Sequence, residues 1–83
     1  MKPARRPYQN LSGDSGVRFY AAGADFLRVW FIGGDGYEYD YDKPGRSHVE
    51  EMKRLAEAGR GLATYISRYV RENFARKLPP AEA

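Results

Sequence analysis

The first half of the chain is marked by apolar and polar positions that alternate residue by residue. Three runs rich in β-branched and aromatic residues, at 17–22, 26–31 and 37–42, are typical of strands. In the third run, YEYDYD, every second residue is tyrosine and the residues between are acidic. A strand built from it has one aromatic face and one acidic face.

The loop between the second and third runs decides where the tyrosines point, because its length sets which residues share a face. A two-residue turn sets them opposite the mixed face of the second strand. A three-residue loop at 32–34 pairs Leu27 with Tyr39 and Arg28 with Glu38. We prefer this second register, which joins apolar to aromatic side chains and adds a cross-strand charge pair. It predicts that the phenol rings face the core.

Two later runs have helical spacing. The run from Ser47 carries Glu50 three residues on, the spacing of a capping box, and Gly59 is suited to end that helix. A second helix is expected over 62–77, with an apolar stripe along one side. The predicted fold is therefore α+β: a three-stranded antiparallel meander with two C-terminal helices packed on one face, in the order β-β-β-α-α.

The chain has 83 residues, enough for one small domain. Its proline, glycine and polar residues predict a flexible basic arm at 1–14 and a proline-containing tail at 78–83. The folded domain is expected at 15–77. It contains no cysteine, which excludes disulfides and thiolate metal sites. With no apolar run of signal-peptide or membrane-span length, a cytoplasmic protein is expected.

The net charge of +3 conceals a division along the chain. The region of the third strand is acidic, whereas the predicted second helix is basic. Segregated charge of this kind favours oppositely charged partners or contacts between copies of the chain. It is equally typical of two solvated faces that keep a small protein soluble.

Catalytic chemistry finds little support in the residues. The single histidine, His48, falls at the start of a predicted helix, where a solvated side chain is the simplest interpretation. Asp40 and Asp42 share one strand face, yet two carboxylates lack the further oxygen ligands that calcium requires. No catalytic residue, metal ligand, cofactor or small-molecule substrate is therefore expected.

Two stretches resemble a known family, the KTSC domain, a short module named for its place at the C-terminus of some lysyl-tRNA synthetases and also found alone in bacterial and phage proteins. The stretch LRVWFIGGDGYEYDY resembles the family's alternating strand, glycine turn and central Y-x-Y. The stretch GRGLATYISRYV resembles its glycine-led final helix, with Gly61, Ile66 and Val70 at matching places. The chain departs from the family at Ala63, where asparagine is frequent. The resemblance implies an association with RNA by analogy with the synthetase.

A nucleic acid is expected to prefer the basic side chains, because phosphate neutralisation supplies most of the affinity. The predicted second helix and the arm provide them. The candidate RNA-binding residues are Arg60, Arg68, Arg71, Lys77, Arg5 and Arg6.

The alternative is a protein-interaction module, including a homodimer or a phage-type inhibitor of a host factor. With both helices on one side, the other sheet face shows a mixture of aromatic and arginine side chains, which is typical of interface cores. The candidate interface residues are Arg18, Tyr20, Phe26, Arg28 and Trp30. A simpler alternative is that a helix covers this face, which would make these residues part of the core.

Overall fold

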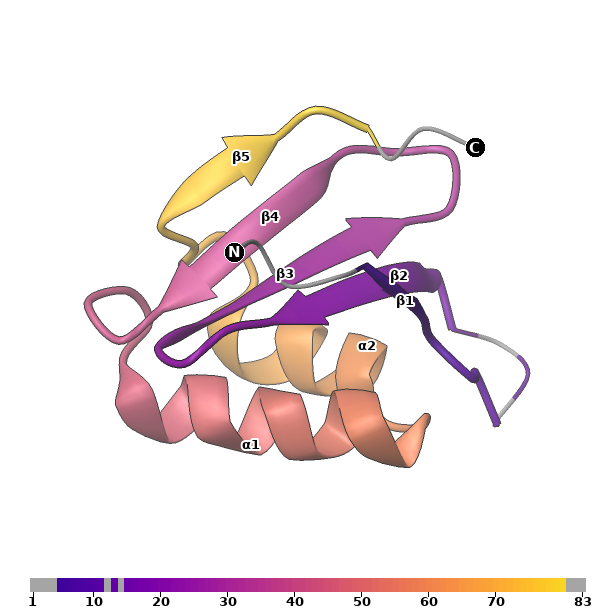
Figure 1. Cartoon of the computed structure of the whole chain (residues 1–83), viewed down its shortest axis with the longest axis horizontal. Helices are drawn as coiled ribbons and strands as arrows, with labels where there is room; N and C mark the ends of the chain where they lie inside the picture. Colours follow the sequence, from indigo (N-terminus) through magenta and orange to yellow (C-terminus); the bar gives the residue numbers. More distant parts are fainter. Residues whose placement is uncertain (1–4, 12, 14, 81–83) are drawn as a thin grey trace.

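The structure, a computed structural model, describes residues 5–11, 13 and 15–80. It is an α+β fold in which a five-stranded antiparallel sheet, in the order β1-β2-β3-β4-β5, is packed by helices on one side (Figure 1). The elements are β1 (Arg6–Pro7), β2 (Val17–Ala22), β3 (Phe26–Phe31), β4 (Gly36–Asp40), α1 (Arg46–Ala58), α2 (Leu62–Tyr65), its π-helical continuation η1 (Ile66–Val70) and β5 (Arg76–Leu78). The predicted three-stranded meander is therefore only the centre of the sheet.

The register of the central hairpin confirms the three-residue loop. Leu27 pairs with Tyr39 and Arg28 with Glu38. The ring of Tyr39 is 1% exposed beneath the helices, and the Tyr41 hydroxyl donates to Glu50 of α1 at 2.8 Å. The tyrosines thus project toward the helices, as the parity of the loop predicted.

A bulge in β2 reverses the expected placement of one residue. Val17 pairs with Phe31, but Phe19 pairs with Trp30, so the register shifts between Val17 and Phe19. The shift turns Tyr20 toward the helices, where it is buried at 8% exposure. The expectation that Tyr20 lies on the uncovered face is wrong, because an extra residue in a strand exchanges the two faces beyond it.

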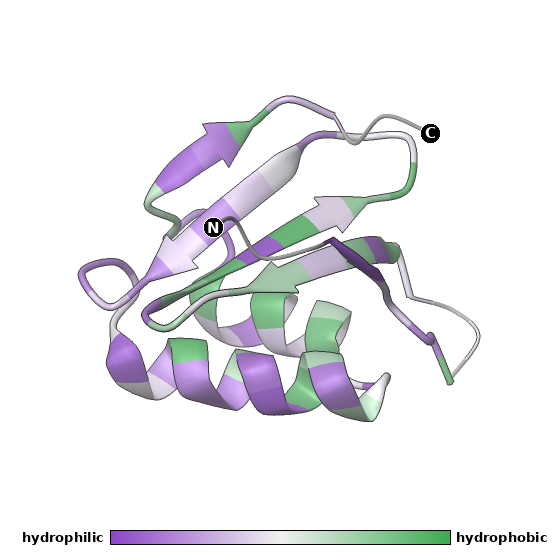
Figure 2. Cartoon of the chain, in the orientation of Figure 1, coloured by the Kyte–Doolittle hydropathy of each residue, from purple (hydrophilic) through white to green (hydrophobic). Residues whose placement is uncertain are grey.

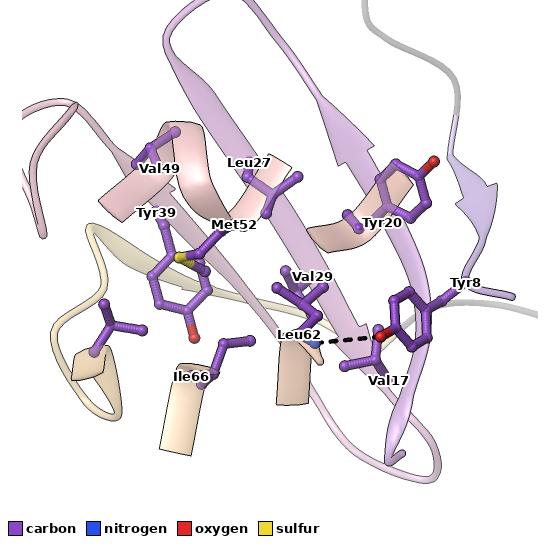
Figure 3. Packing of buried hydrophobic residues seen from close by; sticks show 12 residues of the cluster. Tyr8, Val17, Tyr20, Leu27, Val29, Tyr39, Val49, Met52, Leu62 and Ile66 are labelled. Atoms are coloured by element: carbon purple, nitrogen blue, oxygen red, sulfur yellow. Dashed lines mark hydrogen bonds between the residues drawn. The ribbon is translucent and has the colours of Figure 1, made fainter. Parts of the chain in front are cut away.

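The N-terminal segment contributes to the fold. Arg6 and Pro7 form β1, which pairs with β2, and the next residue, Tyr8, is buried. The Tyr8 hydroxyl accepts a hydrogen bond from the Leu62 amide at 3.2 Å (Figure 3). The predicted flexible arm at 1–14 is thus wrong for its central part, while residues 1–4, 12 and 14 lie outside the described residues.

The second helix is shorter than the predicted 62–77. The π-helical turn η1 ends at Val70, the Arg71 amide makes the last bond to the Ile66 carbonyl, and Arg71 takes a φ of 29°. The chain then returns as β5 along the free edge of β4, with Lys77 opposite Tyr37. Strand pairing and ion pairs to β4 outweigh the good helix propensity of these basic residues.

Helix α1 ends as predicted but begins differently. Gly59 has a φ of 76°, and its amide donates to the carbonyls of Leu55 and Ala56. At the other end Gly45 is the N-cap, and no side chain caps the helix. The helix begins before Ser47 because the Gly45 carbonyl already accepts from the Val49 amide at 3.1 Å.

The core lies between the sheet and the helices. Figure 2 shows apolar and polar segments alternating along α1, as expected of a helix that packs by one side. The largest fully buried side chains are those of Tyr39, Leu27, Met52, Leu62, Val17, Val29, Val49 and Val70, several of which are drawn in Figure 3. Within the described part of the chain, no helix has the length and apolar character needed to cross a bilayer.

Candidate functional site

The sheet face turned away from the helices is the candidate site, called here the open face. Three aromatic side chains lie on it, Phe19 of β2 and Phe26 and Trp30 of β3, and all three are half-buried. Phe19 and Trp30 are cross-strand partners, so their side chains leave neighbouring positions on the same face. Figure 1 shows both helices on the opposite side of the sheet. No helix of the described residues covers this face (Figure 1), so the alternative in which a helix buries it does not apply to them.

Arginine side chains lie over these rings. The Arg5 guanidinium is 4.7 Å from the centre of the Phe19 ring and 5.8 Å from that of Trp30. Arg18 lies 5.0 Å from Phe19. On the neighbouring ring, Arg28 lies 4.7 Å from Phe26. Cation–π contacts of this length hold planar cations parallel to an aromatic surface.

The carboxylate at the centre of the open face is already neutralised. Glu38 of β4 accepts from Arg28 at 2.8 Å and from Arg76 at 3.1 Å, and only 12% of its side chain is exposed. Burial acts to raise the pKa of Glu38, but the hydrogen bonds and charges of the two arginines outweigh it and hold that pKa below its usual value. Two cations thus surround the Glu38 carboxylate and balance its charge within the protein.

A second carboxylate beside this face supports the backbone. One oxygen of Asp40 accepts from the amides of Asp42 and Lys43 at 3.0 and 2.9 Å. This geometry fixes the turn that leads from β4 toward α1. The charge of Asp40 is thus partly satisfied inside the protein.

The C-terminal segment borders the open face. Leu78 of β5 pairs with Gly36, next to Trp30, and the Trp30 indole donates to the carbonyl of Pro79 at 3.2 Å. A side chain at Gly36 would meet the Trp30 ring at 2.5 Å. The indole is therefore oriented from both sides, while its ring remains half-buried.

The predicted interface residues are largely brought together here. Arg18, Phe26, Arg28 and Trp30 lie on the open face, and Tyr20 does not. Sequence reasoning missed Phe19, because the bulge that turns it outward leaves no clear mark in the alternation. It also missed Arg76, which the predicted helix placed on the wrong element.

The predicted RNA-binding residues do not form one surface. Arg60 lies in the turn between α1 and α2. Arg68 lies on η1, and Arg71 follows its last residue. Lys77 belongs to β5, where it is bound to Asp35 at 2.9 Å. Only Arg5 joins the open face; Arg6 pairs with Tyr20, on the helix side of the edge strand.

The single histidine has a structural partner. His48 Nδ1 lies 2.7 Å from the hydroxyl of Tyr65 on α2, and the two rings meet edge to face with centres 5.8 Å apart. The expected freely solvated side chain is thus half-buried between the helices. Among the described residues, no group of three or more histidine, aspartate or glutamate side chains is placed to hold a metal ion.

The comparisons with known proteins give no relative. No family model, no curated protein and no solved structure matches the chain.

Proposed function

We propose that this protein is a non-enzymatic module that binds single-stranded RNA on its open face. The observation that carries the proposal is the row of Phe19, Trp30 and Phe26 on a helix-free sheet face, with arginine side chains over the rings. Single-stranded RNA is bound in this way elsewhere, because unstacked bases lie on aromatic or guanidinium planes while cations neutralise the phosphates. The KTSC resemblance supports the same class of partner by analogy.

The charge of the open face favours RNA over a basic protein surface. Arg18, Arg28 and Arg76 lie on or beside it, and Glu38 is held between two of these arginines. The acidic residues of the third predicted strand would repel phosphates if they were unpaired. With Glu38 paired, the remaining guanidinium charge attracts them.

The test is the affinity for a fluorescein-labelled single-stranded RNA, measured by anisotropy over a range of salt concentrations. Trp30→Ala and Phe19→Ala should each weaken binding by about 1–3 kcal/mol, the value of one stacked base. Tyr69→Ala is the matched control, because Tyr69 is 59% exposed and lies on η1, away from the open face. Trp30 is the only tryptophan, so stacking should also change its fluorescence.

Absence of binding at low salt, or an equal loss from Tyr69→Ala, would remove the proposal. The same variants then test the protein-interaction alternative, because tryptophan and arginine are frequent anchors of protein interfaces. A homodimer seen by analytical ultracentrifugation and dissociated by Trp30→Ala, without RNA binding, would favour that alternative.

A further inference from the structure

A pocket lies on the other side of the sheet from the open face. It has a volume of ≈ 620 Å³ and is formed where η1 ends and the chain turns back toward β5. Its wall is aromatic: the rings of Tyr37 and Phe74 are 4.7 Å apart, and Phe31 meets Tyr37 edge to face at 5.9 Å. Pockets of about this size and lining accept small molecules.

A tyrosine hydroxyl group faces this pocket. Tyr39 lines it and is 1% exposed as a whole residue. Its hydroxyl makes no hydrogen bond to another described residue, and the described residues include no fully buried side-chain oxygen without a partner, so this oxygen is open to the pocket. Figure 3 shows the hydroxyl directed to the side of Ile66, a second lining residue. Burial, with a smaller effect of Tyr37, raises the pKa of Tyr39, so the phenol keeps its proton at neutral pH. A tyrosine hydroxyl can donate one hydrogen bond, and this one is placed to donate to a molecule in the pocket.

The rim carries one cation and one anion without internal partners. Arg71 and Glu72 both line the pocket and are exposed, and neither side chain forms an ion pair or hydrogen bond with another described residue. The other cation of the lining, Lys77, is bound to Asp35 at 2.9 Å. A ligand with only a negative or only a positive charge would meet one like charge at this rim. A zwitterion satisfies both.

We propose that this pocket binds a free amino acid with an aromatic side chain. Its ring packs against Tyr37 and Phe74, its carboxylate lies at Arg71 and its ammonium group at Glu72. A polar group on the ring accepts from the Tyr39 hydroxyl, so tyrosine is favoured over phenylalanine. The site holds a ligand and transforms nothing, and it is independent of RNA binding on the opposite face.

The test is a titration of the ¹⁵N-labelled protein with L-tyrosine and L-phenylalanine, followed by NMR. Saturable shifts are expected at Tyr37 and Phe74. Arg71→Gln should weaken binding about tenfold or more, since a hydrogen bond to a charged group is lost. Arg68→Gln is the matched control, because Arg68 is exposed on η1 and does not line the pocket. N-acetyl-L-tyrosine and L-tyrosine methyl ester, each lacking one charge, should bind more weakly than L-tyrosine.

Tyr39→Phe keeps the ring and removes the hydroxyl, so it should abolish a preference for tyrosine of about twofold to tenfold. The proposal is overturned if neither amino acid gives saturable shifts at the pocket. It is also overturned if 3-phenylpropionate binds as tightly as L-phenylalanine, or if Arg71→Gln and Arg68→Gln behave alike. These comparisons stand even if Tyr39→Phe does not fold.

Discussion

Glu38 connects the stability of the sheet to the charge of the open face, and its replacement by glutamine tests both. Its carboxylate joins three strands, because Arg28 belongs to β3 and Arg76 to β5. Glu38→Gln keeps the size of the side chain and removes the charge. We expect a less stable protein that nevertheless binds single-stranded RNA more tightly.

The structure sets the size of both effects. Glu38 and Arg28 are 12% and 22% exposed, whereas Arg76 is 59% exposed and screened by solvent. The loss of free energy of unfolding should therefore be about 1–3 kcal/mol, almost all of it from the Arg28 pair. The two released arginines can each neutralise a phosphate, which steepens the slope of log K against log salt by up to about 1.4.

Two assays separate these effects. Urea denaturation gives the free energy of unfolding, and anisotropy at several salt concentrations gives the affinity for single-stranded RNA and its slope. Glu57→Gln is the control, because the substitution removes the same charge. Glu57 is exposed on α1 and has no ion-pair partner among the described residues. It should change neither the stability nor the slope by a comparable amount.

An unchanged or shallower salt slope in a folded Glu38→Gln protein would refute the reasoning. It would mean that Arg28 and Arg76 do not reach the phosphates even when released. Equal gains from Glu38→Gln and Glu57→Gln would point to net charge alone.

The remaining predictions concern stability. The pKa of Glu38 is lower in the folded protein than in the unfolded chain. Its contribution to the free energy of unfolding is therefore present above the unfolded pKa and is lost as the pH falls through the folded pKa. Acid titrations followed by circular dichroism should show a smaller loss of stability with falling pH in Glu38→Gln. Tyr8→Phe leaves the buried Leu62 amide without its acceptor and should cost about 1–3 kcal/mol in urea denaturation; a change within error would show that water replaces the hydroxyl. Gly36→Ala places a Cβ 2.5 Å from the Trp30 ring and should cost about 1–3 kcal/mol and alter Trp30 fluorescence; an unaltered spectrum would contradict the close packing.

Local rules predicted the centre of the fold. The three-residue loop and the wholly apolar face of Leu27, Val29 and Phe31 were enough to obtain the β3–β4 register, because one slip would bury the acidic face of β4. Gly59, just after α1, was predicted for a similarly local reason: the left-handed φ that commonly follows the end of a helix favours glycine.

Long-range pairing could not be predicted in the same way. Strands β1 and β5 contain two and three residues, too few for a periodic pattern, and they form by pairing with edges that are distant in sequence. The bulge in β2 is equally hidden, since it depends on how Val17 and Phe19 meet β3. These features place Phe19, Arg5 and Arg76 on the open face, so the candidate site was harder to predict than the core.

The charges along the chain favour one kind of partner when considered from the sequence and another once the sheet is assembled. In the sequence, the acidic residues around β4 suggest attraction to an external basic partner. In the structure, Asp35 holds Lys77, Glu38 holds Arg28 and Arg76, and Asp40 holds the amides of a turn. Strand β5 thus supplies Arg76 and Lys77 as partners for Glu38 and Asp35. Most of the acidic charge that suggested an external basic partner is therefore paired within the sheet. Arginines over aromatic rings remain at the surface, and this is why an anionic, stacking partner fits the assembled face better than a basic one.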